Sequence, residues 1–359
     1  MRVFFILWLL AAAAATAQTG RTRNVILVMT DGLRWQEVFR GADPALMNKK
    51  DGGVGDVDAL RKEFWRESPA ERRAALLPFL WSTVASQGQI FGNRDAGSDA
   101  FVTNGLNFSY PGYSETLCGF VDPGVDSNNK IPNPNVTVFE WLHSKPAFRG
   151  KAAGFGAWDV FPFIFNAPRA GFPVNAGSDP FTMTPMPPGL ALMNRLKRES
   201  AIWDSEAFDT FTFHTAKMYL LEKKPRLLYL SLGETDEWSH EGKYAEYLRS
   251  AHRVDAYLKE LWEAVQSMPQ YRSNTTLIFL PDHGRGEAPV EWKSHGQKIP
   301  DSKYIWMAFL GPDTKALGER KQTGPVTQHQ VAATLAALLG EDYQRAVPKA
   351  GAPIGDVLR

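Results

Sequence analysis

Carboxylate and imidazole side chains that could bind a metal ion stand close together in the last quarter of the sequence. The apolar run Leu277–Leu280 is followed almost at once by Asp282 and His283, and His295 lies in the next glycine-flanked loop. Aspartate and histidine are common ligands of catalytic divalent metals. Because the apolar run predicts a strand, the sequence indicates part of a metal site just beyond the end of that strand.

Two further apolar runs lead to residues of the same kind. Leu227–Leu230 precedes Asp236 and His240, which are four residues apart and would share one face of a helical turn. Asn24–Thr30 ends directly at Asp31. Each match alone is weak, because an Asp-x-x-x-His pair often arises by chance and an aspartate after a strand is also an ordinary helix cap.

A candidate nucleophile lies in the stretch Asn107–Gly119. Ser109 is followed by a tyrosine and a proline, and the next helix is predicted to open at Ser114. A hydroxyl held at a helix N-terminus faces free backbone N–H groups, which suit a phosphoryl oxygen. On local sequence alone an aromatic-rich turn is the stronger interpretation. The single cysteine, Cys118, has no basic neighbour to lower its thiol pKa, so we expect it to be buried.

The elements that must position these residues alternate between strands and helices along the chain. This order predicts an α/β fold, doubly wound, with a mostly parallel central sheet flanked by helices. The carboxyl ends of parallel strands meet at one edge of such a sheet, which would bring the candidate ligands into one crevice. We also expect a helix over residues 190–224. The segment from about 158 to 188 is rich in Pro, Phe and Gly and is predicted to be an irregular lid or substrate wall.

The composition bounds the partners and the setting of the protein. The 359 residues are 44% hydrophobic, and 40 basic against 39 acidic residues give a net charge of +1. This balance predicts neither nucleic-acid polymer binding nor attraction to a membrane surface. Residues 1–17 have the pattern of a secretory signal peptide and are too short for a comfortable membrane anchor. We therefore expect an exported protein, periplasmic or secreted, with a single catalytic domain over residues 18–359. The sequence predicts no particular oligomeric state.

Five motifs, taken in order along the chain, resemble the alkaline phosphatase superfamily and most closely its type I phosphodiesterase/nucleotide pyrophosphatase branch: NVILVMTDG, FSYPGYSETLCG, ETDEWSH, LPDHGRG and SHG. The resemblance implies an alkaline-phosphatase-like fold with Ser109 as the nucleophile. The branch usually has Asn-His where this chain has Gly112-Tyr113, which leaves the nucleotide preference open. The implied metal ligands fall into two sets, Asp236, His240 and His295 for one ion, and Asp31, Asp282, His283 and Ser109 for the other.

The charges of this constellation agree with a two-metal centre. Two divalent cations bring four positive charges, and three aspartates with an ionised Ser109 bring four negative charges while the histidines stay neutral. A pair of ions about 4 Å apart would hold the attacking and leaving oxygens of an in-line displacement. We expect Ser109 to form a phosphoseryl intermediate, which water activated at the Asp236/His240/His295 ion then hydrolyses. Zn²⁺ is the expected metal, with Mn²⁺ as the alternative.

Substrate recognition is less defined by the sequence. The family places an asparagine downstream of the nucleophile to steady a phosphoryl oxygen, and Asn128 or Asn129 could fill that place. No Lys or Arg lies between Phe108 and Asn129, which favours small monoanionic phosphodiesters or nucleotide pyrophosphates over dianionic monoesters. Lys130 and Arg169 are the basic residues that could fold in. A phosphomonoesterase, a mutase-like relative and an inactive exported binding protein are the alternatives.

Overall fold

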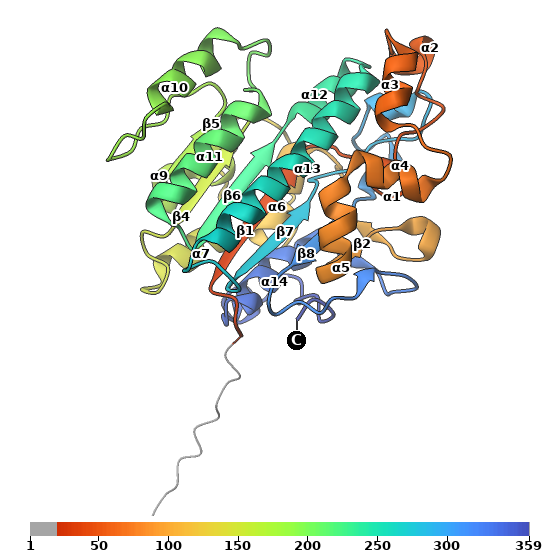
Figure 1. The fold of residues 1–359 in the computed structure, drawn as a ribbon. Helices are drawn as coiled ribbons and strands as arrows, with labels where there is room; N and C mark the ends of the chain where they lie inside the picture. Colours follow the sequence, from red (N-terminus) through yellow and green to blue (C-terminus); the bar gives the residue numbers. More distant parts are fainter. Residues whose placement is uncertain (1–19, 359) are drawn as a thin grey trace, which may run out of the picture.

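The computed structural model describes residues 20–358, and a mostly parallel eight-stranded sheet runs through the middle of them (Figure 1). In spatial order the sheet consists of β5 (Val174–Ala176), β4 (Ala152–Gly156), β6 (Leu227–Leu232), β1 (Asn24–Thr30), β7 (Thr275–Leu280), β8 (Met307–Leu310), β2 (Gln89–Phe91) and β9 (Gly318–Glu319). Only β8 runs antiparallel to its neighbours in this sheet. β1 is buried along its whole length, as expected of a parallel strand covered on both faces. A separate pair joins β3 (Ala100–Phe101) to β10 (Val326–Thr327).

Helices cover both faces of the sheet (Figure 1). Successive side chains of a strand point to opposite faces, so Ile26 and Val28 of β1 lie in one hydrophobic cluster while Val25 and Leu27 lie in another. Helices that contribute to the first cluster are α1 (Trp35–Arg40), α3 (Val57–Phe64), α4 (Pro69–Leu76), α10 (Leu190–Glu199), α11 (Asp209–Lys223) and α13 (Tyr244–Ser267). Helices that contribute to the second are α6 (Ser109–Cys118), α7 (Val138–Ser144), α8 (Phe161–Ile164), α9 (Ala167–Ala170), α14 (Val331–Leu338) and α15 (Tyr343–Ala346).

Shorter elements connect these layers. They comprise α2 (Lys49–Gly52), α5 (Ala85–Gln87), α12 (Glu234–His240), a π-helical turn η1 (Leu80–Val84), and the 3-10 turns η2 (Arg94–Ala96), η3 (Glu291–Lys293), η4 (Pro300–Lys303) and η5 (Gln328–Gln330). α12 matters most for the site, because it starts directly after β6, at the carboxyl end of that strand.

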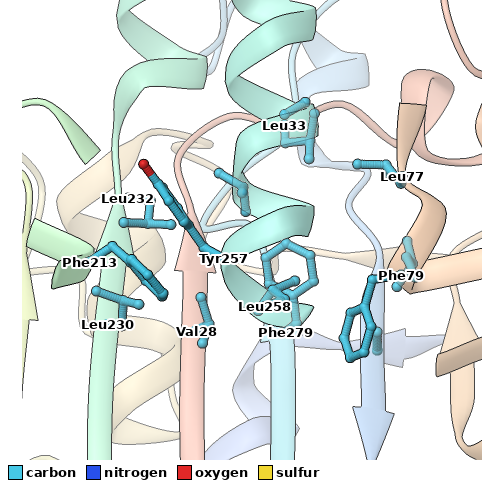
Figure 2. Packing of buried hydrophobic residues seen from close by; sticks show 14 of the residues in the cluster. Val28, Leu33, Leu77, Phe79, Phe213, Leu230, Leu232, Tyr257, Leu258 and Phe279 are labelled. Carbon is cyan, nitrogen blue, oxygen red and sulfur yellow. The ribbon is translucent and has the colours of Figure 1, made fainter. Parts of the chain in front are cut away.

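Aromatic and aliphatic side chains fix α11 and α13 on the sheet (Figure 2). Val28, Leu230 and Phe279, from three adjacent strands, lie beneath Leu258 and Tyr257 of α13. The ring of Tyr257 also stacks on Phe213 of α11, with centroids 4.1 Å apart. Burying each large apolar side chain stabilises the fold by about 1.5–3 kcal/mol. The packing of α11 and α13 on the sheet therefore stabilises the strands whose ends carry the candidate ligands.

The predicted α/β fold is confirmed, and some boundaries are corrected. The single helix expected over residues 190–224 is wrong, because α10 ends at Glu199 and α11 begins only at Asp209. Between them Glu206 pairs with Trp158 in an extended bridge, which a continuous helix would prevent. The segment 158–188 contains α8, α9 and the edge strand β5, and its role as a lid stays a prediction.

Two expectations concern the location of the protein: a signal peptide at its N-terminus and no stable membrane anchor. Residues 1–17, interpreted as a signal peptide, lie outside the described residues. Within residues 20–358, no helix has the length and apolar character that crossing a membrane requires.

Cys118 is fully buried, as expected, and burial raises the pKa of its thiol to about 12.

Candidate active site

The candidate ligands gather where β1, β6 and β7 end side by side. Met29 of β1 is in register with Leu280 of β7, and Thr30 is in register with Leu232 of β6. The next residues after each strand therefore face one another at the carboxyl edge of the sheet. These positions carry, in strand order, the Asp236-containing helix α12 after β6, Asp31 after β1, and Asp282 and His283 after β7.

One cluster brings together a carboxylate and two imidazoles. His240 Nε2 lies 3.1 Å from Asp236 Oδ2 and 3.0 Å from His295 Nε2, while His295 Nε2 lies 3.8 Å from Asp236 Oδ1. Asp236 and His240 are one helical turn apart in α12, which explains why both reach the same point. The spacing of these atoms fits three ligands of one metal ion.

A second cluster surrounds His283. Its Nε2 lies 3.2 Å from Asp31 Oδ1, 3.4 Å from Asp282 Oδ2 and 3.3 Å from the hydroxyl Oγ of Ser109. The same nitrogen is 4.0 Å from Asp236 Oδ1, so the two clusters adjoin. Ser109 thus lies with the ligands that the family resemblance implies for the second ion. The three residues here whose ligand atoms all lie within 4.8 Å of one another are Asp31, His283 and Asp236, so Asp236 adjoins both clusters.

The donor atoms of both clusters fit divalent metal ions. Asp31 Oδ1 and Asp282 Oδ2 are buried and have no hydrogen-bond partner within residues 20–358, an arrangement that is costly for a carboxylate unless a cation is bound. His283 Nδ1 lies 2.9 Å from the carbonyl oxygen of Gly284, and His295 Nδ1 lies 3.2 Å from that of Asn107. When each Nδ1–H donates to its carbonyl, the lone pair of Nε2 is directed into the site, which is the usual arrangement of a metal-binding histidine.

Burial and the charges of neighbouring side chains shift the pKa values of the candidate ligands. Burial, reinforced by repulsion from Asp236, raises the pKa of Asp31 well above its usual value, and burial with repulsion from Asp31 does the same for Asp282. Burial lowers the pKa of His283 to about 4 and holds that of His295 well below its usual value. His283 and His295 are therefore neutral, the form that binds metals. Burial alone would lower the pKa of His240, but attraction to Asp236 outweighs it and raises this pKa above its usual value. A bound cation would favour the ionised carboxylates.

Ser109 occupies the first turn of α6, earlier than predicted. The helix was expected to open at Ser114, yet it begins at Ser109, because Pro111 falls in the first turn where no N–H donor is required. Asn128 Oδ1 accepts the Tyr110 N–H at 3.0 Å and so caps this end of the helix from a distant loop. Ser109 is thereby held at the positive end of the helix dipole, which favours a phosphoryl group.

Gly112 and Tyr113, which depart from the family pattern, both serve this site. A Cβ atom at Gly112 would lie 2.3 Å from the carbonyl oxygen of Asp282, so only glycine fits where α6 meets the β7 end. The Tyr113 hydroxyl donates to Asp31 Oδ2 at 2.9 Å and accepts from Ser231 Oγ at 3.0 Å. Tyr113 thus orients a candidate ligand, a role that the sequence comparison did not suggest.

Arg285 was also missed by the sequence reasoning. Its guanidinium is fully buried, contacts Asp236 Oδ1 through Nη1, and donates to the main-chain oxygens of Trp292 (2.8 Å) and Lys293 (2.5 Å). Burial acts to raise the pKa of Asp236, but Arg285 and then His240 outweigh it and hold this pKa well below its usual value. The available signal was a basic residue two positions after His283.

The predicted substrate-binding residues have different surroundings. Asn128 and Asn129 are both exposed in one loop, and Asn128 reaches the nucleophile helix through its side chain. Lys130 pairs with Asp159 at 2.6 Å. The Arg169 guanidinium binds Glu140 at 2.8 Å and donates to the main-chain oxygens of residues 133–135, so it is engaged in holding that loop.

Comparison with solved structures shows a shared fold. Wild-type alkaline phosphatase PafA aligns with a TM-score of 0.59 and 12% identity over 95% of this chain and 99% of that chain. Murine ectonucleotide pyrophosphatase/phosphodiesterase 5, an inactive variant in complex with AMP, gives 0.55 and 12% over 94% and 100%. Lipoteichoic acid synthase LtaP from Listeria monocytogenes gives 0.57 and 12% over 90% and 73%. At such identities the likeness concerns the fold alone.

The sequence itself identifies the family. No curated protein matches the chain, but residues 45–338, more than half of its length, match the family described as type I phosphodiesterase / nucleotide pyrophosphatase. The matched region includes Ser109 and five of the six candidate ligands, and Asp31 lies just before it. The chain therefore belongs to the type I phosphodiesterase/nucleotide pyrophosphatase family and is a phosphoester hydrolase of the metal-dependent alkaline phosphatase superfamily.

Proposed function

We propose that this protein cleaves small phosphodiesters or nucleotide pyrophosphates through a phosphoseryl intermediate on Ser109. The observation that carries the proposal is the place of the hydroxyl: Ser109 Oγ lies 3.3 Å from His283 Nε2, at the N-terminus of α6 and beside both ligand clusters. A serine hydroxyl is a weak nucleophile in water and needs such a setting.

The candidate ligands would divide between two divalent ions, with Asp236, His240 and His295 at one, and Asp31, Asp282, His283 and Ser109 around His283 at the other. When bound, the ions would lower the pKa of the serine hydroxyl and neutralise charge on the phosphoryl group. Zn²⁺ suits these mixed nitrogen and oxygen donors, and Mn²⁺ is the alternative.

The proposed reaction consists of two successive displacements at phosphorus. Ser109 Oγ forms a bond to phosphorus as the bond to the leaving oxygen breaks. Water next attacks the phosphorus bound to Ser109, which releases a phosphate monoester that keeps the remaining ester group and restores the serine hydroxyl. The Oδ1 atom of Asn128 is used by the Tyr110 N–H, so we propose that its NH₂ group donates to a phosphoryl oxygen.

The charges near the nucleophile support a diester or pyrophosphate substrate. Dianionic monoesters usually require an added cation at the phosphoryl oxygens. Here Lys130 is paired with Asp159, and the Arg285 guanidinium is buried against Asp236. A phosphomonoesterase is the second candidate, because the Lys130–Asp159 pair is half exposed and could open toward a dianion.

We also propose that the enzyme is exported. We propose export through cleavage after Ala17, leaving one catalytic domain from residue 18 with the segment 158–188 beside the site as a substrate wall. Mass spectrometry of the protein expressed from its full sequence should give a mature chain that begins at Gln18. Retention of Met1 would contradict export by this route.

Hydrolysis of paired p-nitrophenyl esters tests the reaction. The wild-type protein should cleave the phosphate diester faster than the phosphate monoester or the sulfate, and both chelation and Ser109→Ala should abolish this activity. Acid quench of the wild type during turnover of a ³²P-labelled phosphodiester should trap the label on Ser109. A faster monoester reaction would keep the site and change the function, while turnover that survives Ser109→Ala would refute the phosphoseryl intermediate. Absence of any hydrolysis would favour an inactive binding protein.

A further inference from the structure

Arg285 places a permanent positive charge among the candidate metal ligands. Its side chain has no exposed surface, and its Nη1 contacts Asp236 Oδ1, the oxygen that also faces His283 and His295. An arginine side chain is not deprotonated in proteins. The charge is therefore present whether or not metal ions are bound, and the count of charges at the site has to include it.

The same side chain connects separate parts of the ligand shell. Arg285 follows His283 by two residues, and the main-chain oxygens that accept its Nε–H and Nη2–H belong to Trp292 and Lys293, just before His295. The Asp236–Arg285 pair also requires Gly32, since a Cβ there would lie 2.6 Å from Asp236 Oδ1 and 2.9 Å from Arg285 Nη1. The pair is thus built into the site and is not a surface contact.

With Arg285 included, the two ligand sets carry different charges. Asp31 and Asp282 with a neutral His283 sum to −2, which one divalent ion neutralises. Asp236 supplies a charge of −1 to the other set, whose two histidines bind a metal ion in their neutral form, and the guanidinium of Arg285 offsets that charge. A divalent ion in the Asp236 set would therefore enter a position with no net ligand charge and a cation beside it.

We propose that Arg285 makes the two metal positions unequal, so that the Asp31/Asp282/His283 position keeps its ion without substrate while the Asp236/His240/His295 position fills tightly only together with an anionic phosphate group. This inference rests on the proposed two-metal function. The incoming phosphate supplies the negative charge that Arg285 removes from the second position. Arg285 acts here as a positioning residue and a charge partner of Asp236.

Metal binding to the full, chelator-stripped chain tests this inference without reference to turnover. Zn²⁺ affinities are measured by competition with a chromophoric chelator, with and without inorganic phosphate, for the wild type, Arg285→Gln and Arg285→Lys. We expect the wild type to bind one Zn²⁺ at least about tenfold more tightly than the second, and phosphate to strengthen the second alone. Arg285→Lys keeps the charge and should keep this inequality, whereas Arg285→Gln should reduce it and weaken the phosphate effect.

Several outcomes would overturn the inference. Two equally tight sites in the wild type without phosphate would contradict it, and so would identical binding curves for Arg285→Gln and Arg285→Lys. The phosphate effect in the wild type decides the question even if a variant does not fold. Two equally tight sites together with diester cleavage would contradict the role of Arg285 but not the two-metal function. Absence of Zn²⁺ binding, or diester cleavage that survives full chelation, would contradict the two-metal function as well.

Discussion

Replacing Tyr113 by phenylalanine removes one oxygen atom from the site and little else. The tyrosine is buried, and its ring packs edge-on against Phe161 with centroids 4.8 Å apart, a contact that phenylalanine can retain. Its hydroxyl donates to Asp31 Oδ2, whose partner atom Oδ1 has no hydrogen bond within residues 20–358. The substitution therefore leaves Asp31 free to rotate away from the position in which it faces His283.

Two independent estimates give the size of the effect. A hydrogen bond to a charged group contributes about 1.5–3 kcal/mol. Loss of a hydrogen bond that orients a metal ligand typically lowers metal affinity or activity by about 10–100-fold, which corresponds to about 1.4–2.8 kcal/mol. Both ranges predict that Tyr113→Phe needs about 10–100 times more Zn²⁺ for half-maximal activity, while kcat at saturating Zn²⁺ stays within a few-fold of the wild type.

The assay is a Zn²⁺ titration of diester cleavage by the chelator-stripped enzyme. Tyr110→Phe is a matched control from the same helix, since the Tyr110 hydroxyl donates to the main-chain oxygens of Ile131 (2.6 Å) and Phe163 (3.2 Å) and touches no candidate ligand. The control should unfold more easily than the wild type but need the same Zn²⁺ concentration. The reasoning is refuted if Tyr113→Phe has the Zn²⁺ requirement of the wild type, or if both variants shift it equally.

Three further perturbations test other parts of the structure. Asp282→Ala should abolish turnover and metal retention together, as measured by diester hydrolysis and by metal analysis of the dialysed protein; an active variant would sink the two-metal assignment. Gly112→Ala should lower the unfolding free energy by about 1–3 kcal/mol through overpacking, whereas Gly55→Ala, which would meet no atom within 4 Å, should leave it nearly unchanged in urea denaturation. Burial lowers the pKa of Lys197 from 10.5 to about 8, so the unfolded chain binds more protons between these pH values and the unfolding free energy of the metal-free protein should rise with pH there. Lys197→Met should flatten this rise by about 1–3 kcal/mol, and equal pH slopes for both proteins would contradict the assigned burial penalty.

The strands and the gathering of polar residues at their ends could be predicted because both follow from local sequence. A run such as NVILVMT has few alternatives to a buried parallel strand, and β1 has the predicted bounds. The place of Asp31, Asp236 and Asp282 then follows from the rule that parallel strands end at one edge. The capping box at the start of α4, formed between Ser68 and Glu71, likewise follows from the local sequence Ser-Pro-Ala-Glu.

Other features depend on contacts between distant segments, and local sequence carries little sign of them. The start of α6 depends on Asn128, nineteen positions after Ser109, which supplies the cap that the adjacent Phe108 cannot. The break between α10 and α11 depends on the pairing of Glu206 with Trp158. Helical periodicity at residues 190–224 says nothing about that bridge, and tertiary pairing overrides local propensity.

The two departures from the family pattern, Gly112 and Tyr113, both contact candidate metal ligands, and so does the buried Arg285. Gly112 leaves room for the main chain at Asp282, Tyr113 donates to Asp31, and Arg285 offsets Asp236, so each of these residues acts on one of the three carboxylates. Carboxylates set how much positive charge the site can hold, and that charge decides which phosphate anion it accepts. The preference for one phosphate ester over another is therefore expected to respond to substitutions at these three positions, which lie behind the ligands, as well as to residues that contact the leaving group.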